Sequence, residues 1–139
     1  MHERIQLEQE YSAKQSQLQA YNNQMTVLNN KITRVEKLKA EFVEHKSELI
    51  ALQNKLKTIA KENYDYWIGD RLDHYQDLLR ADLVNDSLSD YIKKIDQNLD
   101  ELNNELMRLQ NEVYSTEGLI GSIKSALNWL STKIENLVN

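Results

Sequence analysis

The chain has 139 residues, with no Pro, no Cys and only three Gly. Because a fold of many short elements needs turn residues at each connection, this composition predicts few and long elements. The lack of Cys excludes a disulfide framework and thiolate chemistry. The formal net charge of -5 argues against nucleic acid as a partner, because such binding depends on clustered Lys and Arg that neutralise phosphates.

The N-terminal residues contain neither the basic region nor the apolar stretch of a Sec-type signal peptide. No window approaches about eighteen consecutive apolar residues, which is the length that a membrane-spanning helix needs. We therefore expect neither a Sec leader nor a membrane span.

Residues from about 3 to about 63 form the first predicted helix. Its apolar residues recur at alternating steps of three and four, as in a helix that packs against a partner along one stripe. The stripe contains Leu18, Tyr21, Met25, Leu28, Ile32, Val35, Phe42, Leu49 and Leu56. Lys39 and Lys46 fall where it should be apolar. We expect the stripe to move there to a flanking row of Leu38, Leu52 and Ile59, as a helix of about 3.6 residues per turn drifts against a repeat of about 3.5.

The only candidate turn lies at residues 64–70, near the middle of the chain. Within it, Trp67 can fill the space where two helices part, and Gly69 permits a tight or left-handed backbone. The two arms also differ in charge, with ten Lys/Arg against eight Asp/Glu in residues 1–63 and seven against thirteen in residues 70–139. Opposite charge balances favour side-by-side pairing, so we predict an all-α fold, a single long antiparallel helical hairpin that spans residues 1–139.

The second predicted helix runs from about residue 71 to about residue 137 and has the clearest pattern in the sequence. Alternating steps of four and three lead through Leu88, Ile92, Ile95, Leu99, Leu102, Leu106, Leu109, Val113, Thr116, Ile120, Ile123, Leu127, Leu130, Ile134 and Leu137. Fourteen of these fifteen residues are apolar, and Thr116 is the exception. A repeat of about 3.5 residues kept over this length is the condition for a coiled-coil contact.

Residues 82–87 are more polar than their surroundings and allow two interpretations. Ser87 to Asp90 resemble a helix N-cap followed by an acidic first turn, which would break the second helix. Alternatively, the helix is continuous and its polar residues lie on the outer surface.

The sequence contains no convergent set of catalytic or metal-binding residues. His2, His45 and His74 are far apart, and none has a second His or a Cys one helical turn away. Seven Asp between residues 65 and 90 lack the alternating spacing, Gly and final Glu of a calcium-binding EF-hand loop. We therefore expect a protein that is not an enzyme and that uses no cofactor or metal.

A surface for a partner is expected on the second helix, because an isolated two-helix hairpin buries only one stripe per helix. Residues 11–30 contain one charged side chain and residues 113–132 contain two, so these facing windows are unusually uncharged. Seven residues there or nearby lie opposite the stripe: Met107, Tyr114, Gly118, Gly121, Ser122, Ser125 and Trp129. Small residues between aromatic anchors would form a shallow groove for another helix. The alternative is a locally flexible helix that tolerates two Gly and an exposed Trp.

Trp67, Ile68 and Gly69, at the centre of a two-arm heptad chain without Pro, Cys or signal peptide, give the chain a resemblance to a known family. The chain resembles the Trp-Xaa-Gly (WXG) superfamily of small helical-hairpin proteins of type VII secretion in Gram-positive bacteria. The polar first arm, residues 109–114 (Leu-Gln-Asn-Glu-Val-Tyr) and Gly118 are similar to its YwqH-like branch. One feature departs from the pattern, because family export signals often read Tyr-x-x-x-Asp/Glu and Tyr114 is followed by Gly118.

This resemblance implies a targeting factor, or chaperone-like adaptor, that binds the helical N-terminal LXG domain of a toxin and supports its type VII secretion. It also implies a second small helical-hairpin protein as a further partner. The expected location is the cytoplasm before export. Two outcomes are then open: the protein is secreted with its cargo, without a Sec signal peptide, or it stays in the cytoplasm. The alternative function is a structural coiled-coil spacer, or a self-assembling hairpin that forms a four-helix homodimer.

Overall fold

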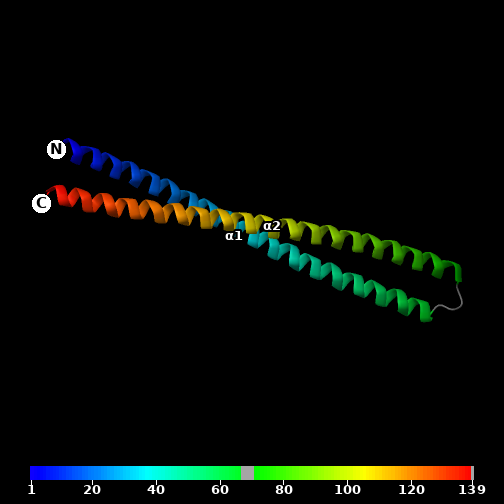
Figure 1. The fold of residues 1–139 in the computed structure, drawn as a ribbon. Coiled ribbons are helices and arrows are strands. Elements are labelled where there is room, and N and C mark those ends of the chain that lie inside the picture. Colours follow the sequence, from blue (N-terminus) through cyan, green and yellow to red (C-terminus); the bar gives the residue numbers. More distant parts are fainter. Residues whose placement is uncertain (67–70, 139) are drawn as a thin grey trace. The chain divides into compact units, whose positions relative to one another are not determined.

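The protein is an all-α helical hairpin of two long helices, as predicted (Figure 1). The computed structural model describes the backbone of residues 1–66 and 71–138, and the side chains of residues 1–58 and 84–138. Helix α1 spans His2–Tyr66 and helix α2 spans Arg71–Val138. Residues 64–66, which the sequence places in the turn, belong to α1, whereas Trp67 and Gly69 lie outside the described residues. Helix α2 continues without a break through residues 82–87.

The contacts within the chain divide it into two units. The terminal unit comprises Met1–Val35 and Glu105–Asn139, and the central unit comprises Glu36–Asn104. In the terminal unit, the start of α1 and the end of α2 lie at the same end (Figure 1). In the central unit, Lys46 contacts Asp96 and Gln53 contacts Ser89, so residue numbers rise along α1 as they fall along α2. The two helices are therefore antiparallel within each unit.

One row of side chains on α1 forms its contact stripe. Every described α1 side chain that is buried or half-buried lies on this row: Leu7, Tyr11, Lys14, Leu18, Tyr21, Met25, Leu28, Ile32, Val35, Lys39, Phe42, Lys46, Leu49, Gln53 and Leu56. Lys39 and Lys46 stay on it, while the side chains of Leu38 and Leu52 are 43% and 46% exposed. The expected shift of the stripe to Leu38 and Leu52 is therefore wrong. Ile59, the third residue of that row, lies outside the described side chains.

Polar groups of α2 explain why Lys46 and Gln53 remain in the stripe. The Lys46 ammonium lies 2.5 Å from the carboxylate of Asp96, so its aliphatic stem can cover the stripe while its charge reaches the edge. The Gln53 amide donates a hydrogen bond of 2.6 Å to the hydroxyl of Ser89. Ser89, in the segment that resembled an N-cap, thus accepts a hydrogen bond from α1, and α2 continues through this segment.

Replacement of Lys46 by Leu is expected to raise the free energy of unfolding by about 1 kcal/mol, because Leu buries more apolar area at this half-buried position. The ion pair with Asp96 is partly exposed and contributes only about 0–1 kcal/mol. Lys37→Leu, on the exposed side of α1, is the matched control and should give no gain. Urea unfolding monitored by circular dichroism gives the free energy of unfolding of both variants. An equal change in the two variants would contradict the assignment of Lys46 to the stripe.

The predicted stripe on α2 is confirmed from Leu88 to Ile134, since each of its residues is buried or half-buried. Leu137, the last of the row, is 47% exposed, because it lies in the final turn of α2, where α1 begins. The buried Thr116 donates a hydrogen bond of 2.8 Å to the backbone carbonyl of Glu112, so its hydroxyl is satisfied within its own helix. Among the described side chains, five apolar ones are buried: Leu28, Ile95, Leu109, Ile123 and Leu130.

Candidate functional site

All seven residues predicted to bind a partner are exposed on α2 in the terminal unit. We call this set the outer face: Met107, Tyr114, Gly118, Gly121, Ser122, Ser125 and Trp129. Its three large apolar members, Met107, Tyr114 and Trp129, are 58%, 66% and 57% exposed. The outer face lies away from α1, because the contact stripe of α2 lies on the other side of the helix. At about 1.5 Å per residue, Tyr114 and Trp129 are about 22 Å apart along the helix.

The two glycines of the outer face leave open space in front of the helix backbone. A Cβ atom added at Gly118 or Gly121 would meet no atom within 4 Å. Neither glycine has a positive φ, so neither is needed for backbone conformation. Each Gly inside a helix costs roughly 1 kcal/mol relative to Ala. No atom of the described residues packs against either glycine, and close approach by another helix would offset this cost.

Charge is sparse and balanced around the outer face. The terminal unit contains seven Lys/Arg and seven Asp/Glu, so its formal net charge is zero. The Lys133 ammonium lies 5.1 Å from the ring centre of Trp129, one helical turn away. Such an exposed cation–π contact contributes only about 0.5–1 kcal/mol, and it leaves one ring face for another contact. The outer face therefore suits an uncharged helix surface.

Arg108, next to Met107, is held between two acidic residues of α2. Its guanidinium donates a hydrogen bond of 2.9 Å to Glu105 and a second one to Glu112. The hydrogen bond from Arg108 lowers the pKa of the Glu105 carboxyl below its ordinary value. Because the carboxyl pKa is lower in the folded chain, ionised Glu105 contributes to folding stability above its unfolded-state pKa. This contribution is lost as the pH falls through the folded-state pKa. At neutral pH the Glu105 carboxyl is therefore ionised and paired with Arg108 on the surface beside Met107.

The described residues contain no group of three or more His, Cys, Asp or Glu able to hold a metal ion. In the same part of the chain, no helix is long and apolar enough to cross a membrane. His45 lies 3.7 Å from Glu48 on the surface of α1, one helical turn away. Both side chains of that pair are exposed. The absence of enzymatic activity stays a prediction.

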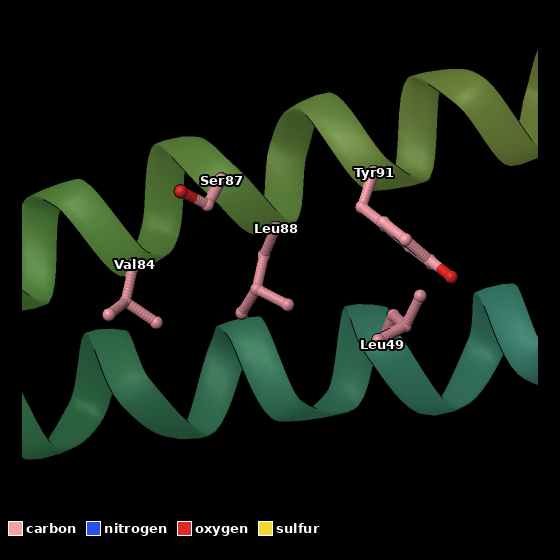
Figure 2. Close-up of a pocket in the computed structure, with 5 residues that line it drawn as sticks. All are labelled: Leu49, Val84, Ser87, Leu88 and Tyr91. Carbon is pink, nitrogen blue, oxygen red and sulfur yellow. The ribbon is translucent and has the colours of Figure 1, made fainter.

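A second apolar surface, in the central unit, escaped the sequence analysis. Figure 2 shows Val84 and Leu88 of α2 directed toward α1, and Tyr91 reaching down beside Leu49 of α1. With Ser87, these residues line a shallow groove of about 440 Å³. A smaller depression of about 220 Å³ is lined by Leu38, Glu41, Phe42 and His45 of α1.

The sequence pattern that indicates this groove is a set of apolar residues, each one position before a residue of the contact stripe. Leu38 and Leu52 precede Lys39 and Gln53 on α1, and Val84 and Tyr91 take the corresponding positions on α2. In an antiparallel helix pair, such positions of both helices lie on the same side of the contact. The sequence analysis assigned Leu38 and Leu52 to the stripe itself and therefore did not predict an apolar surface beside it.

Comparisons with protein-family models, with curated proteins and with solved structures each return no match for this chain. The resemblance to the Trp-Xaa-Gly superfamily therefore stays a prediction.

Proposed function

We propose that the protein is a non-enzymatic targeting factor, or chaperone-like adaptor, that binds the helical N-terminal LXG domain of a toxin and supports its type VII secretion. The outer face of α2 is the surface that we assign to this domain. The exposure of Tyr114 and Trp129 on either side of two open glycines is the observation that supports this role best. The choice of toxin domain and secretion route rests on the family resemblance.

The accessible surface of the chain supports the need for a partner. The chain exposes 10665 Å², whereas a globular protein of its 16.3 kDa mass would expose roughly 7,500 Å². Large apolar side chains contribute to this surface, as Met107 and Trp129 of α2 illustrate. Burial of such side chains against a second protein is favourable by about 25 cal/mol per Å² of apolar surface.

Helix-bundle completion is the mechanism we propose. A helix of the toxin domain would lie along α2 and approach its backbone closely at Gly118 and Gly121, with Tyr114 and Trp129 packing at its ends. Close packing over small residues gives shape complementarity, and buried aromatic residues are the usual energetic anchors of protein interfaces. The hairpin would then cover apolar surface of the toxin until the secretion machinery takes over the complex.

Replacement of Gly121 by Leu tests this arrangement. The added side chain meets open space in the free chain and improves helix propensity by roughly 1 kcal/mol, so helicity should be kept or raised. Bound partner would collide with it, and we expect co-purification with a co-expressed LXG domain to be lost. Ser16→Leu, which adds the same side chain on the exposed side of α1, should leave co-purification unchanged.

Unchanged co-purification of the Gly121→Leu variant would overturn the assignment of the outer face. A different result, in which the purified chain forms a stable four-helix homodimer and binds no LXG domain, would overturn the adaptor function itself. Analytical ultracentrifugation of the chain with and without the LXG domain separates these outcomes.

A further inference from the structure

The contact stripe of α1 differs in polarity between the two units. Among the described side chains of the central unit, three of its six members are polar: Lys39, Lys46 and Gln53. In the terminal unit the stripe of α1 has nine members, of which Lys14 alone is charged. Because Lys39, Lys46 and Gln53 are seven residues apart, they repeat one position of the heptad pattern. One row of the contact is thus polar throughout residues 36–58.

The contact stripe of α2 differs in burial between the same two units. Four of its residues are buried in the terminal unit: Leu109, Thr116, Ile123 and Leu130. In the described part of the central unit, Ile95 is the buried one. A half-buried apolar side chain removes less surface from water than a buried one, so it contributes less to stability. Residues 36–58 and 84–104, which we call the central segments, therefore gain less from apolar burial than the terminal unit.

Polar contacts between the central segments replace only part of this apolar burial. The ion pair of Lys46 with Asp96 is partly exposed, and such pairs add little to stability because water solvates both charges after separation. The hydrogen bond from Gln53 to Ser89 can likewise be exchanged for hydrogen bonds to water. The side-chain oxygen Oδ1 of Asn85 is buried and accepts no hydrogen bond from the described residues, so separation would give it water as a partner. All three features lower the free energy needed to separate the central segments.

We propose that the central segments separate from each other locally while the terminal unit stays folded. Local opening of this kind needs less free energy than global unfolding and occurs where few apolar side chains are buried. The outer face belongs to the terminal unit, so its residues keep their places on the folded hairpin during the opening. The opening is a property of the free chain and does not depend on the proposed LXG partner.

Native-state amide hydrogen exchange of the full-length chain, resolved by residue with NMR, tests the proposal. We compare residues 42–53 and 88–99 of the central segments with residues 18–32 and 109–123 of the terminal unit. All four windows exclude the helix ends, which fray in any helix. Protection factors in the two central windows should be at least about tenfold lower than in the two terminal windows.

Two variants show whether the units open separately and why. Ile123→Val removes one buried methyl group from the terminal unit, so protection of the terminal windows should fall about fivefold while that of the central windows stays unchanged. The double variant Lys46→Leu, Gln53→Leu makes the polar row more apolar and should raise protection of the central windows at least about fivefold. Lys37→Leu, on the exposed side of the same segment, is its control and should leave that protection unchanged.

Equal protection in the central and terminal windows would overturn the proposal. An equal fall in all four windows of the Ile123→Val variant would also overturn it, because the hairpin would then open as one unit. Unchanged central protection in the Lys46→Leu, Gln53→Leu variant would contradict it as well, since the polar row would then not favour opening. None of these measurements uses the LXG domain, so their outcome is independent of the proposed function.

Discussion

Replacement of Leu109 by Ala is expected to lower the free energy of unfolding by about 2–5 kcal/mol. Leu109 is the most deeply buried side chain described, at 1% exposure, and few other apolar side chains in the described part of the hairpin are buried. Because small folded proteins are stable by only about 5–15 kcal/mol, the variant should unfold at much lower urea concentration. Urea titration monitored by circular dichroism measures this change.

Leu119→Ala is the matched control, since the same atoms are removed from a side chain that is 46% exposed. Its effect should stay below about 1 kcal/mol, as for other surface substitutions. The difference between the two variants measures how much the burial of Leu109 in the contact stripe contributes to stability. Similar losses in both would show that Leu109 does not lie at the contact between the helices.

Trp129→Ala is expected to weaken binding of the LXG domain by about thirtyfold or more, which corresponds to the loss of at least about 2 kcal/mol for an aromatic anchor. The folded chain itself should be little affected, because Trp129 is 57% exposed and contacts Lys133 at the surface. Isothermal titration calorimetry of the purified components gives the affinity, and thermal unfolding of the free chain checks its stability.

The control for Trp129 is Val27→Ala. Val27 is an apolar residue of the same unit, 51% exposed, but it lies on α1 and outside the outer face. Its replacement should change the affinity by less than about threefold. If Val27→Ala weakened binding as much as Trp129→Ala, the partner would contact α1, and the outer face would not be the principal interface.

Sequence periodicity was sufficient to predict the contact stripe of α2, because nearly all of its residues are apolar and regularly spaced. On α1 it also predicted the stripe residues from Leu18 to Leu56 that are apolar, all of which are buried or half-buried. It failed only between them, at Lys39, Lys46 and Gln53, because an apolar pattern treats Lys and Gln as outward-facing. Lys46 and Gln53 instead occupy the stripe, and the partners that allow this, Asp96 and Ser89, lie on the other helix. Such cross-helix pairs cannot be recognised before the register between the helices is known.

The two candidate surfaces show the same limit. The outer face could be predicted because the position of a residue around one helix decides whether it points away from the stripe. The groove beside Leu49 and Tyr91 requires residues from both helices to come together, so it depends on the register. When the rotation of α1 about its axis places Lys39 and Lys46 in the stripe, Leu38 and Leu52 lie beside the stripe and are therefore exposed.

Burial of the outer face in the complex tests the central claim most directly. The chain has no Cys, so Ser125→Cys and Ser16→Cys each provide a single thiol, one on the outer face and one on the exposed side of α1. Maleimide labelling rates should be similar for both in the free chain. With the LXG domain bound, labelling at position 125 should slow at least about tenfold while labelling at position 16 stays unchanged. Equal labelling at position 125 in the free and bound chain would contradict the proposed interface.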